Sequence, residues 1–105
     1  MLYKTTAKPY LMRDSRFQWD DAKAASNIAD HGVSFEAACE AFVDPFALDW
    51  LDESEDYGED RYAMIGMADG RLLYVAYTIR GDAIRIISAR GAGPHERRQY
   101  HEDNN

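Results

Sequence analysis

The sequence predicts a small single domain of the α+β class, in which an antiparallel β-sheet carries two N-terminal helices on one face and is followed by a short C-terminal helix. Three observations predict this fold. The chain has 105 residues, of which 46% are hydrophobic, enough for one modest core. Two segments near the N-terminus have helix caps and a helical spacing of apolar residues. Three later segments, rich in Tyr, Ile, Val and Leu, are separated by turns typical of β-hairpins.

Each of the two N-terminal helices has a recognisable beginning and end. Asp20 is a suitable N-cap for the first helix, and Gly32 closes it because glycine readily adopts the left-handed conformation of a helix cap. Ser34 caps the second helix, which ends before Pro45. This second helix has one apolar stripe, formed by Phe35, Ala38, Cys39 and Phe42.

The strand segments are recognised by alternating polarity and by the turns between them. Their predicted ranges are residues 16–19, 46–50, 60–67, 71–80 and 82–90. Residues 51–58 form an acidic loop between the second and third of them. The turns Asp69-Gly70 and Gly81-Asp82 make consecutive hairpins of the last three segments. Pro94 is suited to the first position of the C-terminal helix, expected to hold residues 96–100.

Composition excludes several classes of protein. The single cysteine, Cys39, cannot form an internal disulfide or complete a cysteine-based zinc site. The chain has no run of about 18 apolar residues that could span a membrane, and residues 1–4 lack the apolar stretch of a signal peptide. We therefore expect a cytoplasmic protein with no membrane partner, no metal site and no cofactor.

The formal net charge of −7 conceals an uneven distribution. Residues 36–60 contain ten Asp and Glu and no Lys or Arg, which gives −10. Residues 61–101 contain seven Arg, no Lys and three acids, and 7 − 3 gives +4. Arginine binds phosphate and carboxylate groups through a planar two-pronged fork that lysine lacks. The second stretch therefore indicates recognition of an anion, or alternatively surface salt bridges to the acidic middle of the chain.

A tight turn at Gly81-Asp82 predicts the pairing of the last two strands. Arg80 then lies opposite Ala83, and Thr78 lies opposite Arg85. Because directly opposed residues share a face, both arginines lie on one side of the sheet, and the apolar residues lie on the side covered by the helices. An open arginine-bearing face can bind a phosphodiester, although exposed strands also use arginine simply as polar surface.

The same counting extends the predicted register along the hairpin. It places Ala76 opposite Ile87 and Val75 opposite Ser88. Arg61 lies on the same face if the alternation along its strand directs its side chain to the side of the sheet that carries Arg80 and Arg85. Arg90 is predicted on the apolar face, at the end of its strand, where it can bend around an edge.

Several motifs together resemble the BrnT toxins of bacterial type II toxin-antitoxin systems. They are Trp19-Asp20-Asp21-Ala22-Lys23, Asn27, His31-Gly32-Val33-Ser34-Phe35-Glu36-Ala37, Glu59-Asp60-Arg61-Tyr62, Gly66, Arg80-Gly81-Asp82, Ile84-Arg85-Ile86-Ile87-Ser88-Ala89-Arg90, Glu96 and Tyr100. The likeness spans residues 16–101, which we interpret as the toxin domain. Residues 1–15 are interpreted as a flexible N-terminal extension and residues 102–105 as a frayed tail.

The resemblance implies a RelE-like ribonuclease fold and cleavage of RNA that halts translation. It also implies neutralisation by a BrnA-like antitoxin, whose ribbon-helix-helix part binds the operon's promoter, so that promoter DNA is contacted only through the antitoxin. The net charge of −7 motivates an alternative, a non-catalytic scaffold or co-repressor that holds its antitoxin on promoter DNA. The acidic residues from 49 to 60 suit a basic antitoxin segment, and equally suit a solubilising loop.

Metal-independent RNA cleavage requires a base for the 2′-hydroxyl and positive groups that stabilise the phosphorane. With the resemblance in view, we assign Arg80 and Arg85 to the scissile phosphate, with Arg61 and Arg90 flanking them.

Two residues are candidates for the general base. Histidine is a common general base, and His31 is matched in the family, but a histidine at a helix C-terminus often only complements the helix dipole. Glu59 lies two residues before Arg61 in the sequence, which an ordinary surface ion pair also explains. The sequence leaves the choice open.

Overall fold

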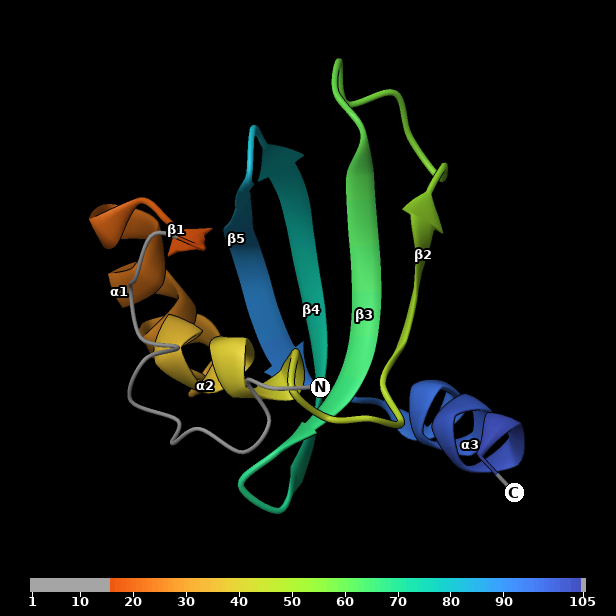
Figure 1. The fold of residues 1–105 in the computed structure, drawn as a ribbon. Coiled ribbons are helices and arrows are strands. Elements are labelled where there is room, and N and C mark those ends of the chain that lie inside the picture. The colour runs from red at the N-terminus through yellow and green to blue at the C-terminus, as the bar shows by residue number, and fades with distance from the viewer. Residues whose placement is uncertain (1–15, 105) are drawn as a thin grey trace.

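Residues 16–104 are described by the computed structural model shown in Figure 1, and the predicted extension at 1–15 lies outside these residues. The elements in chain order are β1 (Phe17–Gln18), α1 (Asp21–His31), α2 (Phe35–Ala41), β2 (Leu48–Asp52), β3 (Arg61–Ala68), β4 (Arg71–Arg80), β5 (Ala83–Gly91) and α3 (Pro94–Asp103). None of the helices among these residues is long and apolar enough to cross a membrane. The α+β class predicted from the sequence is confirmed.

A five-stranded sheet, in the order β1-β5-β4-β3-β2, forms the centre of the structure. β1 runs parallel to β5, and the other neighbouring strands are antiparallel. Helices α1 and α2 lie on one side of the sheet, whereas α3 lies at the β2 end of the structure (Figure 1). We call the sheet face packed by α1 and α2 the helix face and the other face the open face.

The two N-terminal helices begin and end as the sequence predicts. The Asp20 side chain accepts a hydrogen bond from the Lys23 backbone N–H at 3.0 Å, and Gly32 closes α1 with a φ of 69°. The Ser34 hydroxyl accepts from the Ala37 backbone N–H at 3.0 Å. Each cap satisfies a backbone group that the helix itself leaves unpaired, so these short helices are defined locally before they pack.

The main core lies between the helix face and α1 and α2. Phe35 is fully buried, and the predicted burial of Phe17 and Trp19 is confirmed, since each is 5% exposed. The rings of Trp19 and Phe35 meet edge to face, with centroids 5.8 Å apart. A smaller apolar cluster on the open face joins α3 to the sheet through Ile65, Leu72, Ala92 and Tyr100. Both faces therefore contribute to stability, and only part of the open face is left for a ligand.

The predicted register of β4 and β5 is confirmed from the turn as far as Tyr77, which lies opposite Ile86. Beyond that point the prediction is wrong, because Ala76 lies opposite Ser88 and a β-bulge leaves Ile87 as an extra residue in β5. The inserted residue reverses the alternation of all later β5 side chains. Arg90 consequently lies opposite Tyr74 on the open face, not on the apolar face as regular alternation predicted.

Asn27 completes the free edge of β5 beyond the two-residue strand β1. Its side chain accepts from the Ala89 backbone N–H at 3.1 Å and donates to the Ala89 carbonyl at 2.8 Å. It also donates to the Val33 carbonyl at 2.8 Å, and the residue is only 6% exposed. The amide therefore imitates one residue of a neighbouring strand, a structural reason for this asparagine.

β2 begins two residues later than the sequence predicts. Asp44 accepts a hydrogen bond from the Phe46 backbone N–H at 2.8 Å, and its carbonyl accepts from Ala47 at 3.1 Å. This turn leaves Phe46 56% exposed, where alternation had placed it in a strand. The same carboxylate accepts from the Met67 backbone N–H and the Tyr100 hydroxyl, at 2.8 and 2.7 Å. Asp44 thus joins the turn to β3 and α3. Helix α3 itself continues to Asp103, past its predicted end.

We predict that Gly66→Ala destabilises the protein by about 1–3 kcal/mol, because a Cβ there meets the backbone of α2. The added atom would lie 2.7 Å from the Ala41 carbonyl oxygen and 3.1 Å from the Ala41 Cβ. Urea denaturation measures the loss. Gly93→Ala is the matched control, since its Cβ meets only the end of the Glu96 side chain at 3.6 Å. Equal stability of the two variants would contradict close packing of α2 on β3.

Candidate functional site

Three of the four arginines predicted for the site come together at one end of the open face. Thr78 of β4 lies opposite Arg85 of β5, and the β3–β4 register brings Arg61 beside Thr78 from the other side. Arg80 follows Thr78 by two residues in β4 and therefore points to the same face. Arg61 therefore lies on the same face as Arg80 and Arg85. We call Arg61, Arg80 and Arg85 the arginine group.

The spacing of the strands determines how far apart these side chains start. Neighbouring strands lie about 4.8 Å apart, so Arg61 and Arg85 begin about 10 Å from each other, with Thr78 between them. Thr78 is 3% exposed, and its hydroxyl donates to the Asp60 carbonyl at 2.6 Å, which holds the start of β3 against β4. Arginine side chains are long enough to bring guanidinium groups from such positions onto a single phosphate.

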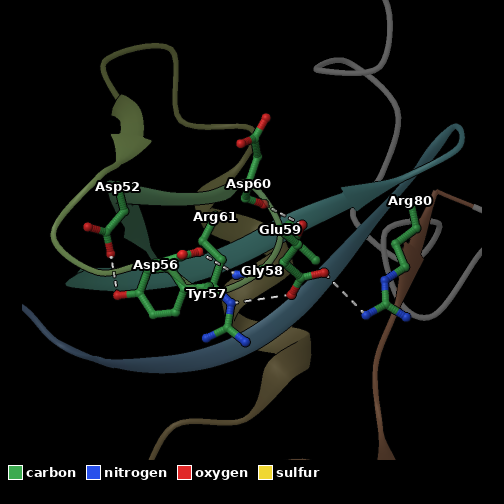
Figure 2. Close-up of polar contacts among 9 residues, drawn as sticks. Asp52, Asp56, Tyr57, Gly58, Glu59, Asp60, Arg61 and Arg80 are labelled. Carbon is green, nitrogen blue, oxygen red and sulfur yellow. Dashed lines mark hydrogen bonds and ion pairs between the residues drawn. The ribbon is translucent and has the colours of Figure 1, made fainter.

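Glu59 already places an anion between two members of the arginine group (Figure 2). Its carboxylate lies 3.3 Å from Nε of Arg61 and 3.6 Å from Nη2 of Arg80. The Arg80 side chain is 52% exposed, and those of Arg61 and Glu59 are about 30% exposed. Exposed ion pairs of this kind contribute only about 0–1 kcal/mol, so a phosphate can replace the carboxylate at low cost.

Arg85 differs from the other two arginines in its partner. Its Nη1 donates to the side-chain oxygen of Gln18 in β1 at 3.2 Å. Gln18 is neutral, and no carboxylate of residues 16–104 lies within ion-pair distance of Arg85. A hydrogen bond to a neutral group orients the guanidinium and leaves its positive charge available to an anion.

Arg90 lies at the other end of the open face and is held by α3. Its guanidinium donates to both carboxylate oxygens of Glu96, at 2.8 and 2.7 Å, and lies 4.2 Å from the centroid of the Tyr74 ring. Since Tyr74 and Thr78 are four residues apart in β4, Arg90 is about 13 Å along the strands from Arg85. The structure therefore does not bring Arg90 together with the arginine group.

The Arg90–Glu96 pair predicts a pH dependence of stability. The hydrogen bonds from Arg90 are the main cause that lowers the pKa of Glu96. Because this pKa is lower in the folded than in the unfolded chain, the contribution is present above the unfolded value and is lost as the pH falls through the folded value. Glu96→Gln should therefore cost about 1 kcal/mol at pH 7 and less at pH 3, measured by urea denaturation. An equal cost at both pH values would contradict an ionised pair.

His31 is exposed in the last turn of α1 and lies away from the arginine group. The carbonyl of the next residue, Gly32, accepts from Nη1 of Arg71 at 3.5 Å. Arg71 begins β4 and Arg80 ends it, and a ten-residue strand is about 30 Å long. Of the two base candidates, Glu59 is the one that the structure brings to the arginine group.

Two residues that the sequence did not single out, Asp52 at the end of β2 and Tyr57 in the loop that follows, support the site. The Tyr57 ring lies beneath the Arg61 guanidinium, with 4.4 Å from Cζ to the ring centroid. The Tyr57 hydroxyl donates to Asp52 at 3.1 Å, and Asp52 also accepts two hydrogen bonds from Ser54. The hydroxyl of Ser54 is the main cause that lowers the pKa of Asp52. The Asp-x-Ser spacing signals a turn, but no local signal indicates that this turn reaches Arg61.

Comparison with known proteins identifies the family of this chain. A search of curated proteins finds no match. Residues 19–96 match a family described as the ribonuclease toxin, BrnT, of type II toxin-antitoxin systems. The match contains all three members of the arginine group, Glu59 and most of the folded chain. The chain therefore belongs to the BrnT family of ribonuclease toxins.

Proposed function

We propose that this protein is a metal-independent endoribonuclease that acts as the toxin of its type II pair, cleaving RNA in the cytoplasm and thereby inhibiting translation. The observation that carries the proposal is the arginine group, three arginines whose strand positions surround Thr78 on the open face. A cluster of fixed positive charges suits a reaction whose transition state gains negative charge on phosphate oxygens. Membership of a ribonuclease toxin family supports RNA as the substrate.

The proposed reaction is attack of a ribose 2′-oxygen on the adjacent phosphorus. The bond between the 2′-oxygen and phosphorus forms as the bond to the 5′-oxygen breaks, which gives a 2′,3′-cyclic phosphate and a 5′-hydroxyl end. Glu59 accepts the proton of the 2′-hydroxyl, and the leaving 5′-oxygen takes a proton from solvent. Arg80 and Arg85 stabilise the negative phosphorane, and Arg61 holds the substrate phosphate beside Glu59.

We further propose that the antitoxin is a BrnA-like ribbon-helix-helix protein, through which the complex contacts promoter DNA. The loop between β2 and β3 carries a strong negative charge and borders the arginine group. A basic antitoxin segment bound there would cover the open face and exclude RNA. This places neutralisation and catalysis at neighbouring surfaces of one small domain.

The test is cleavage of a defined RNA by the purified protein in the presence of EDTA, with the product ends identified. We expect cleavage, cyclic phosphate ends, and growth arrest on expression that the adjacent antitoxin gene relieves. Absence of cleavage at any metal concentration, with promoter binding only in the antitoxin complex, would instead support the non-catalytic co-repressor. Cleavage only after addition of a divalent metal would contradict the metal-independent mechanism.

A further inference from the structure

The face of the Tyr57 ring supports Arg61 without consuming its hydrogen-bond donors. The distance of 4.4 Å between the guanidinium carbon and the ring centroid is within the range of cation–π contacts. A stacked guanidinium is restrained in its plane, while the N–H groups at its rim stay directed outward. One of these, Nε–H, already faces an anion, the Glu59 carboxylate at 3.3 Å. The ring therefore restrains the arginine and leaves it able to bind an anion.

Tyr57 is itself held in place by Asp52, the last residue of β2, as Figure 2 shows. The Tyr57 hydroxyl donates to one Asp52 oxygen at 3.1 Å, while the other accepts from the Ser54 backbone N–H at 2.9 Å and the Ser54 hydroxyl at 2.6 Å. Asp52 lies opposite Arg61 in the β2–β3 ladder. After the Ser54 hydroxyl, the Arg61 charge also contributes to the lowered pKa of Asp52, so this carboxylate interacts with the arginine and, through the Tyr57 hydroxyl, orients the ring.

From this arrangement we infer that Tyr57 is a positioning residue for Arg61, anchored by Asp52, and that it acts on RNA only through that arginine. The inference rests on the proposed function, in which Arg61 binds a substrate phosphate. It gives the acidic loop a role in substrate binding in addition to any contact with the antitoxin. It also explains how a loop of net negative charge can border a surface for an anion: its tyrosine faces the arginine, and Asp52 faces Ser54 and Tyr57.

A double-mutant cycle on RNA affinity separates this role from direct stacking of Tyr57 on a base. The probe is a 2′-O-methyl oligonucleotide, which lacks the nucleophile and cannot be cleaved by the proposed mechanism. We expect Tyr57→Leu to weaken binding about 3- to 10-fold, and Tyr57→Phe, which keeps the ring but loses its hydrogen bond to Asp52, to fall between the parent and Tyr57→Leu. In an Arg61→Ala background, Tyr57→Leu should have no further effect. Equal losses in both backgrounds, or no loss in the parent, would overturn the inference.

The anchor is tested by comparing Asp52→Ala with Glu55→Ala. Both variants remove one negative charge near the arginine group. Because Asp52 lies opposite Arg61, charge alone would make Asp52→Ala the tighter binder, but only Asp52 holds the Tyr57 hydroxyl. We expect Asp52→Ala to bind the 2′-O-methyl probe about threefold or more weakly than Glu55→Ala. Indistinguishable affinities would show that Asp52 does not act through the ring.

A spectroscopic measurement separates failure of this inference from failure of the proposed function. Stacking on Tyr57 should shift the NMR signal of the Arg61 Nε–H upfield through the ring current, and this shift should persist in Tyr57→Phe and vanish in Tyr57→Leu. The same spectra show whether each variant is folded. A parent protein with no shift would overturn the positioning role even if RNA is cleaved. A shift in a protein that binds no RNA would overturn the assigned function and, with it, the role of Tyr57 in RNA binding.

Discussion

Replacing Arg85 by alanine is expected to lower the rate constant for RNA cleavage by about 10²- to 10³-fold, the usual cost of removing one donor that stabilises transition-state charge. Arg85 is the member of the arginine group whose hydrogen-bond partner, Gln18, is neutral, so no ion pair among the described residues has to break before it binds the phosphorane. Arg80→Ala should lower cleavage as well, although the Arg80 side chain is 52% exposed and solvent screens its charge. Single-turnover cleavage of one RNA measures both effects.

The control for charge alone is Arg97→Ala, which removes an exposed arginine from α3 at the far end of the domain. It should change cleavage by less than about threefold, because a distant exposed charge acts only through the screened overall field. Arg85→Lys should recover only part of the activity, since lysine supplies charge without the planar fork. If Arg85→Ala cleaves as fast as the parent, the open face around Thr78 is not the catalytic surface.

Glu59→Gln is expected to separate chemistry from binding. The variant cannot accept the 2′-hydroxyl proton, so the cleavage rate constant should fall by about 10²- to 10⁴-fold. Affinity for an uncleavable RNA should rise at the same time, because the substitution removes the carboxylate that lies between Arg61 and Arg80. Slower cleavage with tighter binding is a combination that partial unfolding does not produce.

The matched variants for this prediction are Glu55→Gln and His31→Gln. Glu55→Gln makes the same chemical change in the same loop, and it should strengthen binding slightly while leaving the rate of cleavage unchanged. His31 is the other base candidate from the sequence, and it lies near Arg71 at the far end of β4. Loss of cleavage in His31→Gln together with normal cleavage in Glu59→Gln would reverse the assignment of the base.

In the proposed mechanism, Glu59 is both a competitor of the substrate and its base. In the free protein its carboxylate satisfies two arginines, and when a phosphate takes its place those arginines gain a new anion. The carboxylate is then released beside the bound ribose, where it can accept a proton. A free toxin built in this way binds RNA more weakly than three unpaired arginines would, which agrees with the net charge of −7.

The shared face of Arg61, Arg80 and Arg85 can be predicted from the sequence. A two-residue turn at Asp69-Gly70 pairs Ala68 with Arg71, and counting back along both strands brings Arg61 beside Thr78. The same counting from Gly81-Asp82 correctly predicted that Arg80 and Arg85 share a face. Turn chemistry therefore determined the register near each hairpin, where no irregularity comes between the turn and the residues concerned.

The face on which Arg90 lies could not be predicted from the sequence, because a β-bulge separates Arg90 from the turn. Regular alternation places Arg90 on the apolar face, whereas the extra residue Ile87 transfers it to the open face, next to Tyr74 and Glu96. No residue near Ile87 signals a bulge in the way that glycine signals a turn. A single inserted residue thus converted an expected member of the site into the contact that secures α3.

The sequence by itself determined the helices, their caps, the hairpins and the class of the fold, because each depends on residues within a few positions of one another. Only the tertiary structure decided which arginines lie together, that Glu59 lies between two of them, and that the Tyr57 ring packs against Arg61. These outcomes depend on the bulge and on the path of the acidic loop over the sheet. Both are set by contacts between different strands and the loop, and the pattern of neighbouring residues does not encode them.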